Sequence, residues 1–191
     1  MYQELYDHIR RYVPLSAEEE SVLASNLSHR VLKKKEHLLT AGQVCHANYF
    51  IVKGCLRLYI MTESGHEQTV QFAIENWWMS DYNTLGTSRI THVNIQSVEN
   101  TEIVVLDATL QEYVFTRIPQ LERYFRLVLQ RAYAAAIMRA QYMLEMREEE
   151  RYRHFSSAFP GFIQRIPQYM LASYLGFTPE FLSKIRAKKD A

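Results

Sequence analysis

The side chains best suited to recognise another molecule lie close together near the carboxyl end of the chain. At helical spacing they form one outward face, which consists of Thr178, Pro179, Glu180, Ser183, Lys184, Arg186 and Lys188. A carboxylate here suits a cytosine amino group, a lysine reaches a guanine edge or a phosphate, and hydroxyls and arginine suit phosphates. This combination indicates recognition of double-stranded DNA.

Two short helices would position these side chains, and the apolar residues between 166 and 189 have the spacing they need. Pro167 suits the first residue of one helix, and Gly176 suits a sharp left-handed turn. Thr178 then suits the N-cap of a second helix. The buried faces would carry Leu171, Ala172, Leu175, Leu182 and Ile185. We interpret the stretch as a helix-turn-helix; the alternative is an ordinary helical hairpin that closes a bundle.

Composition describes a globular chain without an overall basic field. The 191 residues are 48% hydrophobic and 23% charged, with a net charge of +1. DNA affinity would therefore depend on local charge, which is +2 from Ile166 to Ala191. No apolar run is long enough to cross a membrane, and the first residues do not form a signal peptide, so we expect a cytoplasmic protein.

Metal and catalytic signals are weak throughout the chain. The two cysteines, Cys45 and Cys55, do not form a CxxC pair, and the seven histidines are scattered without metal-binding spacing. We predict free thiols, no bound metal and no enzymatic activity, and the sequence identifies no particular cofactor. The competing enzyme hypothesis is a jelly-roll catalyst of the cupin type, which would need histidine and carboxylate ligands on neighbouring strands.

The spacing of apolar residues changes from helical to strand-like within the part of the chain that ends at Leu106. Residues 1–28 have helical spacing, and Ser16 with Glu19 fits a capping box. From Val31 to Leu106, short apolar or alternating segments are separated by turn residues such as Gly42 and Gly54. Six or more short strands at this spacing favour a sandwich or a jelly-roll barrel.

A long helix is predicted from Pro119 to about Arg153. Apolar residues follow steps of three and four along it, interrupted at Arg139. We name this set the predicted seam: Leu121, Phe125, Val128, Ala132, Ala135, Tyr142 and Met146. A helix of roughly 45 Å is longer than one small barrel can cover, so we expect the predicted seam to pair with a second copy of the chain. The alternative is a helix buried against its own domain.

This order of elements resembles the Crp/Fnr superfamily of bacterial transcription regulators over nearly the whole chain. Gly42-Gln43-Val44 with Tyr49–Gly54 is similar to the family's barrel signature, and Gln168–Arg186 is similar to its helix-turn-helix. The resemblance implies an α+β fold with an N-terminal cyclic-nucleotide-binding-like jelly roll (1–115), a long dimerisation helix (116–153) and a DNA-binding domain (154–191). It also implies a homodimer on a palindromic site, a small-molecule effector and RNA polymerase as a partner.

The family's phosphate cassette is altered in this sequence. Ser80 and Asp81 align with its glycine and glutamate, and Thr91 and His92 align with its arginine and serine. An uncharged Thr91 would not neutralise a phosphate, so we expect an effector other than cyclic AMP. The predicted effector pocket consists of Asp81, Tyr82, Asn83, Arg89, Thr91 and His92.

The DNA-binding end also departs from the family. The chain contains little sequence between Arg153 and Pro167 for the small β-hairpin wing that accompanies the family's helix-turn-helix. A competing hypothesis follows, in which the chain is an effector-binding or protein-interaction module of the same fold that has lost DNA binding.

Overall fold

The computed structural model describes residues 2–189, except for the side chains of Lys188 and Lys189. Contacts within the chain divide it into two units. The barrel unit contains Met1–Ile60 and Gln71–Gln130. The helical unit contains Met61–Val70 and the residues from Arg131 onward. The tip of a β-hairpin therefore belongs to the same unit as the carboxyl-terminal helices, which differs from the three consecutive segments expected from the sequence.

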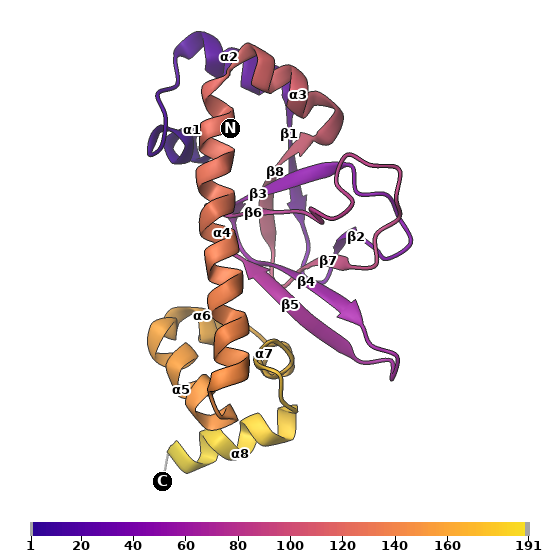
Figure 1. Cartoon of the computed structure of the whole chain (residues 1–191), viewed down its shortest axis with the longest axis vertical. Helices are drawn as coiled ribbons and strands as arrows, with labels where there is room; N and C mark the ends of the chain where they lie inside the picture. The colour runs from indigo at the N-terminus through magenta and orange to yellow at the C-terminus, as the bar shows by residue number, and fades with distance from the viewer. Residues whose placement is uncertain (1, 190–191) are drawn as a thin grey trace. The chain divides into compact units, whose positions relative to one another are not determined.

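Two four-stranded sheets form the core of the barrel unit (Figure 1). Their strands are β1 (Leu27–Leu32), β2 (His37–Leu39), β3 (Ala47–Lys53), β4 (Leu56–Met61), β5 (Glu67–Ala73), β6 (Trp78–Met79), β7 (Asn94–Ser97) and β8 (Thr101–Asp107). One sheet has the order β1-β8-β3-β6 and the other has the order β2-β7-β4-β5. This arrangement confirms the predicted mixed fold with a jelly roll ahead of the long helix.

The central pair of the first sheet, β3 and β8, is buried on both faces. Phe50 lies opposite Val104, and both pack in the cluster that the N-terminal helices cover. Ile51 lies opposite Ile103, and both pack in the second cluster with strands of the other sheet. Burial on two faces explains why these strands contain continuous apolar runs instead of strict alternation.

Gly54 lets the chain turn between β3 and β4 at a crowded position. Its φ is +103°, and a Cβ there would lie 2.6 Å from Thr101 Oγ1 and 2.8 Å from the Asn100 carbonyl oxygen. Both the left-handed backbone and the close approach exclude larger residues. Steric crowding therefore explains why a glycine occupies this position of the family-like signature.

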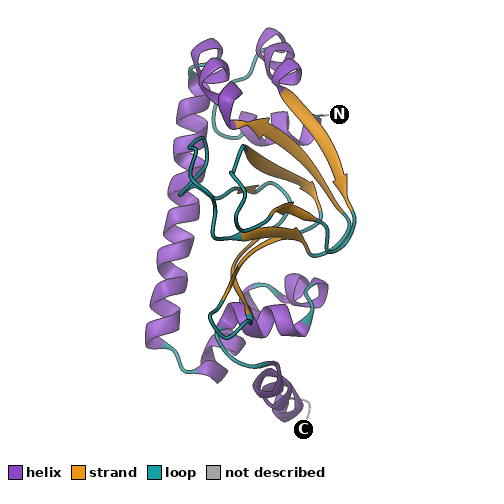
Figure 2. Ribbon diagram, turned by 90° about the vertical axis from the view of Figure 1, so that its right-hand side faces the viewer, coloured by secondary structure: helices purple, strands orange, loops and turns teal. Residues whose placement is uncertain are grey.

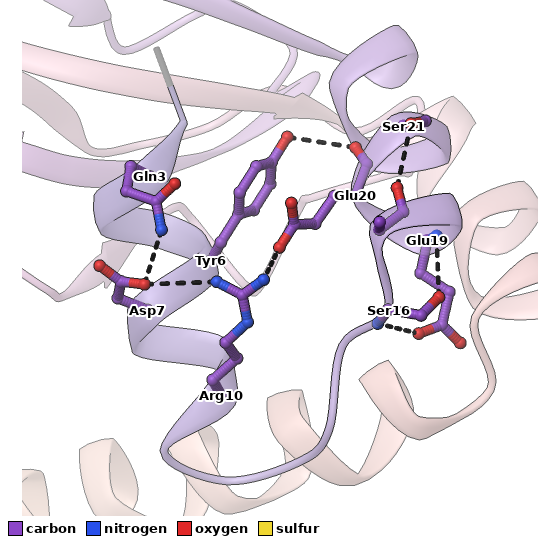
Figure 3. A network of polar contacts seen from close by, with 9 residues as sticks. Gln3, Tyr6, Asp7, Arg10, Ser16, Glu19, Glu20 and Ser21 are labelled. Carbon is purple, nitrogen blue, oxygen red and sulfur yellow. Dashed lines mark hydrogen bonds and ion pairs between the residues drawn. The ribbon is translucent and has the colours of Figure 1, made fainter.

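Three short helices and the start of α4 cover the first sheet (Figure 1). They are α1 (Gln3–Arg10), α2 (Ala17–Asn26), α3 (Ala108–Arg117) and α4 (Gln120–Glu145). The predicted capping box is confirmed, because Glu19 N donates to Ser16 Oγ at 3.2 Å and Ser16 N donates to Glu19 Oε2 at 2.8 Å (Figure 3). Tyr6 also donates to the Glu20 carbonyl oxygen at 3.1 Å, which joins α1 to α2.

The long helix is shorter than the sequence analysis predicts. α4 ends at Glu145, and α5 (Glu148–Ala158) starts after a break. At the break the Arg147 backbone N–H donates to Glu150 Oε2 at 3.1 Å, so a carboxylate three residues later caps the new helix. This local cap competes with continuation of the heptad pattern. α6 (Pro160–Arg165) follows Phe159, where the sequence predicts a break.

The helix-turn-helix is confirmed as α7 (Gln168–Leu175) and α8 (Pro179–Lys189). Gly176 makes the turn at φ +81°, and Phe181 N donates to Thr178 Oγ1 at 3.3 Å, so Thr178 is the N-cap. Pro167 precedes α7 as its cap instead of being its first residue, because its ψ of 136° is extended. The residues expected to be buried between the two helices, Leu171, Ala172, Leu175, Leu182 and Ile185, are buried.

No strand follows β8 in the part of the chain up to Lys189, so the described helical unit has no β-hairpin wing beside the helix-turn-helix. Within residues 2–189, no helix is both long enough and apolar enough to cross a membrane. The same residues contain no group of three or more His, Cys, Asp or Glu side chains that would hold a metal ion.

We predict that Ser16→Ala lowers the free energy of unfolding by about 1 kcal/mol, because the first turn of α2 loses its acceptor. Ser21→Ala is the matched control, since Ser21 Oγ donates to the Ala17 carbonyl oxygen within the same helix (Figure 3). Urea denaturation of the two variants measures the difference. Equal stabilities would contradict a stabilising role for the cap.

Candidate nucleic-acid interface and effector pocket

The outward face of α8 is exposed in the helical unit. Thr178, Pro179, Glu180, Ser183 and Lys184 are exposed, and Arg186 is half-buried. The side chain of Lys188, which also belongs to the predicted face, lies outside the described part of the chain. Leu182 and Ile185 are buried on the opposite side of the same helix. The face that the sequence predicts for DNA thus projects from a helix anchored by its apolar residues.

Glu180 lies in the first turn of α8, where the helix dipole favours negative charge. Hydrogen bonds from its own backbone N–H and from the Thr178 hydroxyl hold the pKa of this carboxyl below its usual range. The side chain is therefore an ionised acceptor at neutral pH. An acceptor at this position suits an exocyclic amino group on a base edge.

Part of the predicted seam on α4 packs within the chain itself, and the pairing of the seam with a second copy stays a prediction. Leu121 and Phe125 are 1% and 7% exposed and belong to the core of the barrel unit, and Val128 packs against that core. In the helical unit, the Tyr142 ring lies 4.6 Å from the His154 ring of α5. Ala132 and Met146 are half-buried, and Ala135 is exposed. The heptad spacing thus matches a helix face that is buried at its amino-terminal end and partly covered beyond it.

A different face of α4 is exposed. Four large apolar side chains on it are exposed: Leu129 (38%), Tyr133 (71%), Ile137 (43%) and Leu144 (88%). Two exposed alanines, Ala136 and Ala140, lie between them. We name these six residues the exposed stripe. Leu129, Tyr133 and Ala136 of the stripe each follow a residue of the predicted seam by one position, and the stripe as a whole lies about 100° around the helix from the seam, at 3.6 residues per turn. Small alanines among large apolar side chains suit close packing of two helices.

Asp81 and Thr91 lie together, as the predicted effector pocket requires, but they bind each other. Thr91 Oγ1 donates to Asp81 Oδ2 at 2.7 Å, and both residues are buried. Thr84 Oγ1 donates to the same oxygen at 2.6 Å, and Asn83 N donates to Asp81 Oδ1 at 3.1 Å. Burial raises the pKa of the Asp81 carboxyl, but these hydrogen bonds outweigh burial and hold the pKa below its usual range.

The other predicted pocket residues lie at the surface. Tyr82, Asn83, Arg89 and His92 are exposed, and Arg89 Nη2 donates to the Asn83 carbonyl oxygen. The structure therefore brings Asp81, Asn83, Arg89 and Thr91 into one hydrogen-bonded loop and does not place a cation at the buried carboxylate. Sequence reasoning missed Thr84, although a hydroxyl three residues after an aspartate is a common signal of a local turn.

We predict that Asp81→Asn destabilises the protein by roughly 1–3 kcal/mol at pH 7, because the variant loses charge-assisted hydrogen bonds. A depressed carboxyl pKa stabilises the fold above the unfolded value of about 3.9. The difference between variant and wild type should therefore shrink as the pH falls through the lower, folded-state pKa.

Chemical denaturation from pH 7 to pH 3 measures this dependence, with the exposed Asp7→Asn as the control. Equal stability of Asp81→Asn and wild type at pH 7 would contradict the assignment. So would a difference that grows as the pH falls.

The family model of the cyclic nucleotide-binding domain matches residues 29–115. No curated protein matches the sequence. The fold resembles that of FixK2 from Bradyrhizobium japonicum, with 15% identity, a TM-score of 0.73 and coverage of 85% of this chain and 83% of that one. It also resembles the c-di-GMP-responsive regulator CLP from Xanthomonas campestris, with 11% identity, a TM-score of 0.75 and coverage of 92% of each chain.

The catabolite activator protein of Thermus thermophilus is a further structural neighbour. It is 20% identical, with a TM-score of 0.55 and coverage of 91% of this chain and 83% of that one. Each of these three alignments covers at least 85% of this chain and at least 83% of the other. Residues 29–115 are therefore similar to a cyclic nucleotide-binding domain, and the chain shares its fold with these solved proteins.

Proposed function

We propose that the protein is a dimeric bacterial transcription regulator that binds a palindromic DNA site through α7 and α8. The observation that carries this proposal is the exposed outward face of α8 on a helix whose opposite side is buried at Leu182 and Ile185. A recognition helix in the major groove needs this division between anchoring and reading faces. We further propose that it acts in the cytoplasm, where it contacts RNA polymerase.

The exposed stripe on α4 supports a homodimer. Large apolar side chains exposed along one helix face are typical of a surface that a partner covers, and a second copy presents the same stripe. The residues from Tyr133 to Leu144 belong to the same unit as α8. A two-fold axis along this stripe would present two recognition helices to half-sites about one DNA turn, ~34 Å, apart.

A cyclic nucleotide does not fit the residues of the cassette. Its phosphate requires a cation, but Thr91 occupies the position that the family resemblance gives to arginine. Its ribose hydroxyl requires a carboxylate acceptor, but Asp81 already accepts from Thr84, Thr91 and Asn83. An anion beside the ionised Asp81 would also be repelled. We propose an effector of different chemistry, acting on the jelly roll.

A second candidate function is an effector-binding or protein-interaction module that does not bind DNA. The absence of a strand after β8 in the described residues favours it, because a β-hairpin wing would add backbone contacts to DNA. A salt titration of DNA binding separates the two functions, since phosphate contacts weaken steeply with rising salt. Lack of salt-dependent binding to any duplex would favour the second candidate.

We predict that Lys184→Ala weakens binding to a duplex selected from random DNA by roughly 1–3 kcal/mol, because the exposed ammonium contacts a base edge or a phosphate. Lys53→Ala, which removes an exposed lysine of the jelly roll, is the control. Fluorescence anisotropy with the selected duplex measures both. Equal affinities of the two variants would remove Lys184 from the interface.

We predict that Ile137→Glu converts the dimer to a monomer at micromolar concentration, because a charge would be buried in the stripe. Met138→Glu is the matched control, since Met138 is 48% exposed but lies about 100° around the helix from Ile137, which is 43% exposed. Sedimentation or light scattering gives the mass of each variant. Dissociation by Met138→Glu alone would place the interface on another face.

A further inference from the structure

The carboxyl end of α7 contacts the first residues of β5, which belong to the helical unit. The β4–β5 hairpin extends toward the carboxyl-terminal helices in Figure 2. Thr69 N donates to Ser173 Oγ at 2.7 Å, and Ser173 Oγ donates to the Glu67 carbonyl oxygen at 2.8 Å. Gln68 Nε2 donates to the Ser173 carbonyl oxygen. β5 is the last strand of its sheet, so its outer edge has no neighbouring strand. The Ser173 hydroxyl thus binds backbone groups of that edge as a paired residue would.

The same end of α7 is held from a second side by α4. Arg139 Nη2 donates to the Tyr174 carbonyl oxygen at 2.7 Å, and the guanidinium lies 4.4 Å from the centre of the Tyr174 ring. A cation suits this place because the last carbonyls of a helix lack partners and carry partial negative charge. Arg139 is also the residue that interrupts the heptad spacing of the predicted seam, and this contact explains the interruption.

The turn of the helix-turn-helix lies against α4 as well. A Cβ on Gly176 would lie 2.5 Å from Met143 Cε. Because this atom is the end of a flexible side chain, the left-handed backbone is the stronger reason for glycine, and the distance shows that the turn lies beside Met143 of α4. Ser173, Tyr174 and Gly176 thus connect the DNA-binding helices to two separate elements over a span of four residues.

We propose that Ser173 and Arg139 are positioning residues that set the separation of the two recognition helices in the dimer. We name them, with their partners Glu67, Gln68, Thr69 and Tyr174, the clasp. The inference rests on the proposed function. Neither Ser173 nor Arg139 belongs to the outward face of α8, so the clasp leaves the DNA-reading residues exposed and acts through the placement of the helix.

The clasp lies between the exposed stripe on α4 and the outward face of α8, and the relative position of these two surfaces would determine the half-site spacing. Tyr133, Ile137 and Leu144 of the stripe lie on the same helix as Arg139, and α8 starts five residues after Tyr174. The covalent path from α4 to α7 is less direct, because it passes through α5 and α6 with breaks at residues 146–147 and at Phe159. The hydrogen bond from Arg139 to Tyr174 bypasses this path and joins α7, and through it α8, to the helix that carries the stripe. The bonds of Ser173 hold the same end of α7 against β5.

Ser173→Ala tests the inference, because alanine keeps the helix and removes both hydrogen bonds of the hydroxyl. Ser156→Ala is the matched control, since Ser156 Oγ donates only to the Arg153 carbonyl oxygen within α5. Binding is measured for both variants and wild type on the selected palindrome and on versions whose half-sites are one or two base pairs closer together or further apart.

We expect Ser173→Ala to bind the preferred spacing roughly threefold to tenfold more weakly, as the loss of one or two hydrogen bonds implies. Binding to the altered spacings should weaken less, so that the preference for one spacing declines. Ser156→Ala should bind like wild type. An equal loss at every spacing, or an unchanged preference, would overturn the positioning role.

Amide hydrogen exchange of the full chain without DNA separates this inference from the proposed function. Ser173→Ala should speed exchange at Thr69, whose N–H donates to the Ser173 hydroxyl, and Ser156→Ala should not. Unchanged exchange at Thr69 would overturn the clasp even if DNA binding were intact. If wild type bound no duplex while exchange at Thr69 still responded, the contact would stand, but the proposed function and the positioning role would both fail.

Discussion

The structure depends on one helix, α4, packing on two sides. One side is used within the chain, where Leu121 and Phe125 complete the barrel core and Arg139 binds the end of α7. The side about 100° away carries the exposed stripe. The stripe residues from Tyr133 to Leu144 lie in the same unit as α7 and α8, so a partner bound there would be held near the proposed recognition helix by contacts within that unit. DNA recognition by a dimer would need these contacts.

The fold could be predicted largely from local patterns, because local constraints produce them. Gly54 and Gly176 have left-handed backbones, and neighbouring atoms lie close to where a Cβ would be. Ser16 and Thr178 cap the two helices whose starts the sequence predicts. The partner of the predicted seam could not be predicted in this way. Its spacing predicts a covered helix face but does not distinguish cover by the chain's own core, where Phe125 packs, from cover by a second chain.

The cassette shows a similar limit. The family resemblance places Thr91 where an arginine would neutralise a phosphate, and this expectation needs only the sequence. That Thr84 and Thr91 both donate to the Asp81 carboxylate depends on how the loop folds, because ten residues separate Asp81 from Thr91. The acid that would serve a ligand in the family instead stabilises its own loop. A sensor of this kind would respond to an effector that does not compete for Asp81.

Disulfide cross-linking of single-cysteine substitutions on α4 tests the central claim most directly. Ala140→Cys places a thiol on the exposed stripe, and Ala132→Cys places one on the predicted seam; the native Cys45 and Cys55 are buried. The account predicts that mild oxidation in the presence of the selected duplex converts Ala140→Cys, but not Ala132→Cys, to a covalent dimer that still binds DNA. Cross-linking through residue 132 alone, or a covalent dimer at residue 140 that no longer binds, would contradict it.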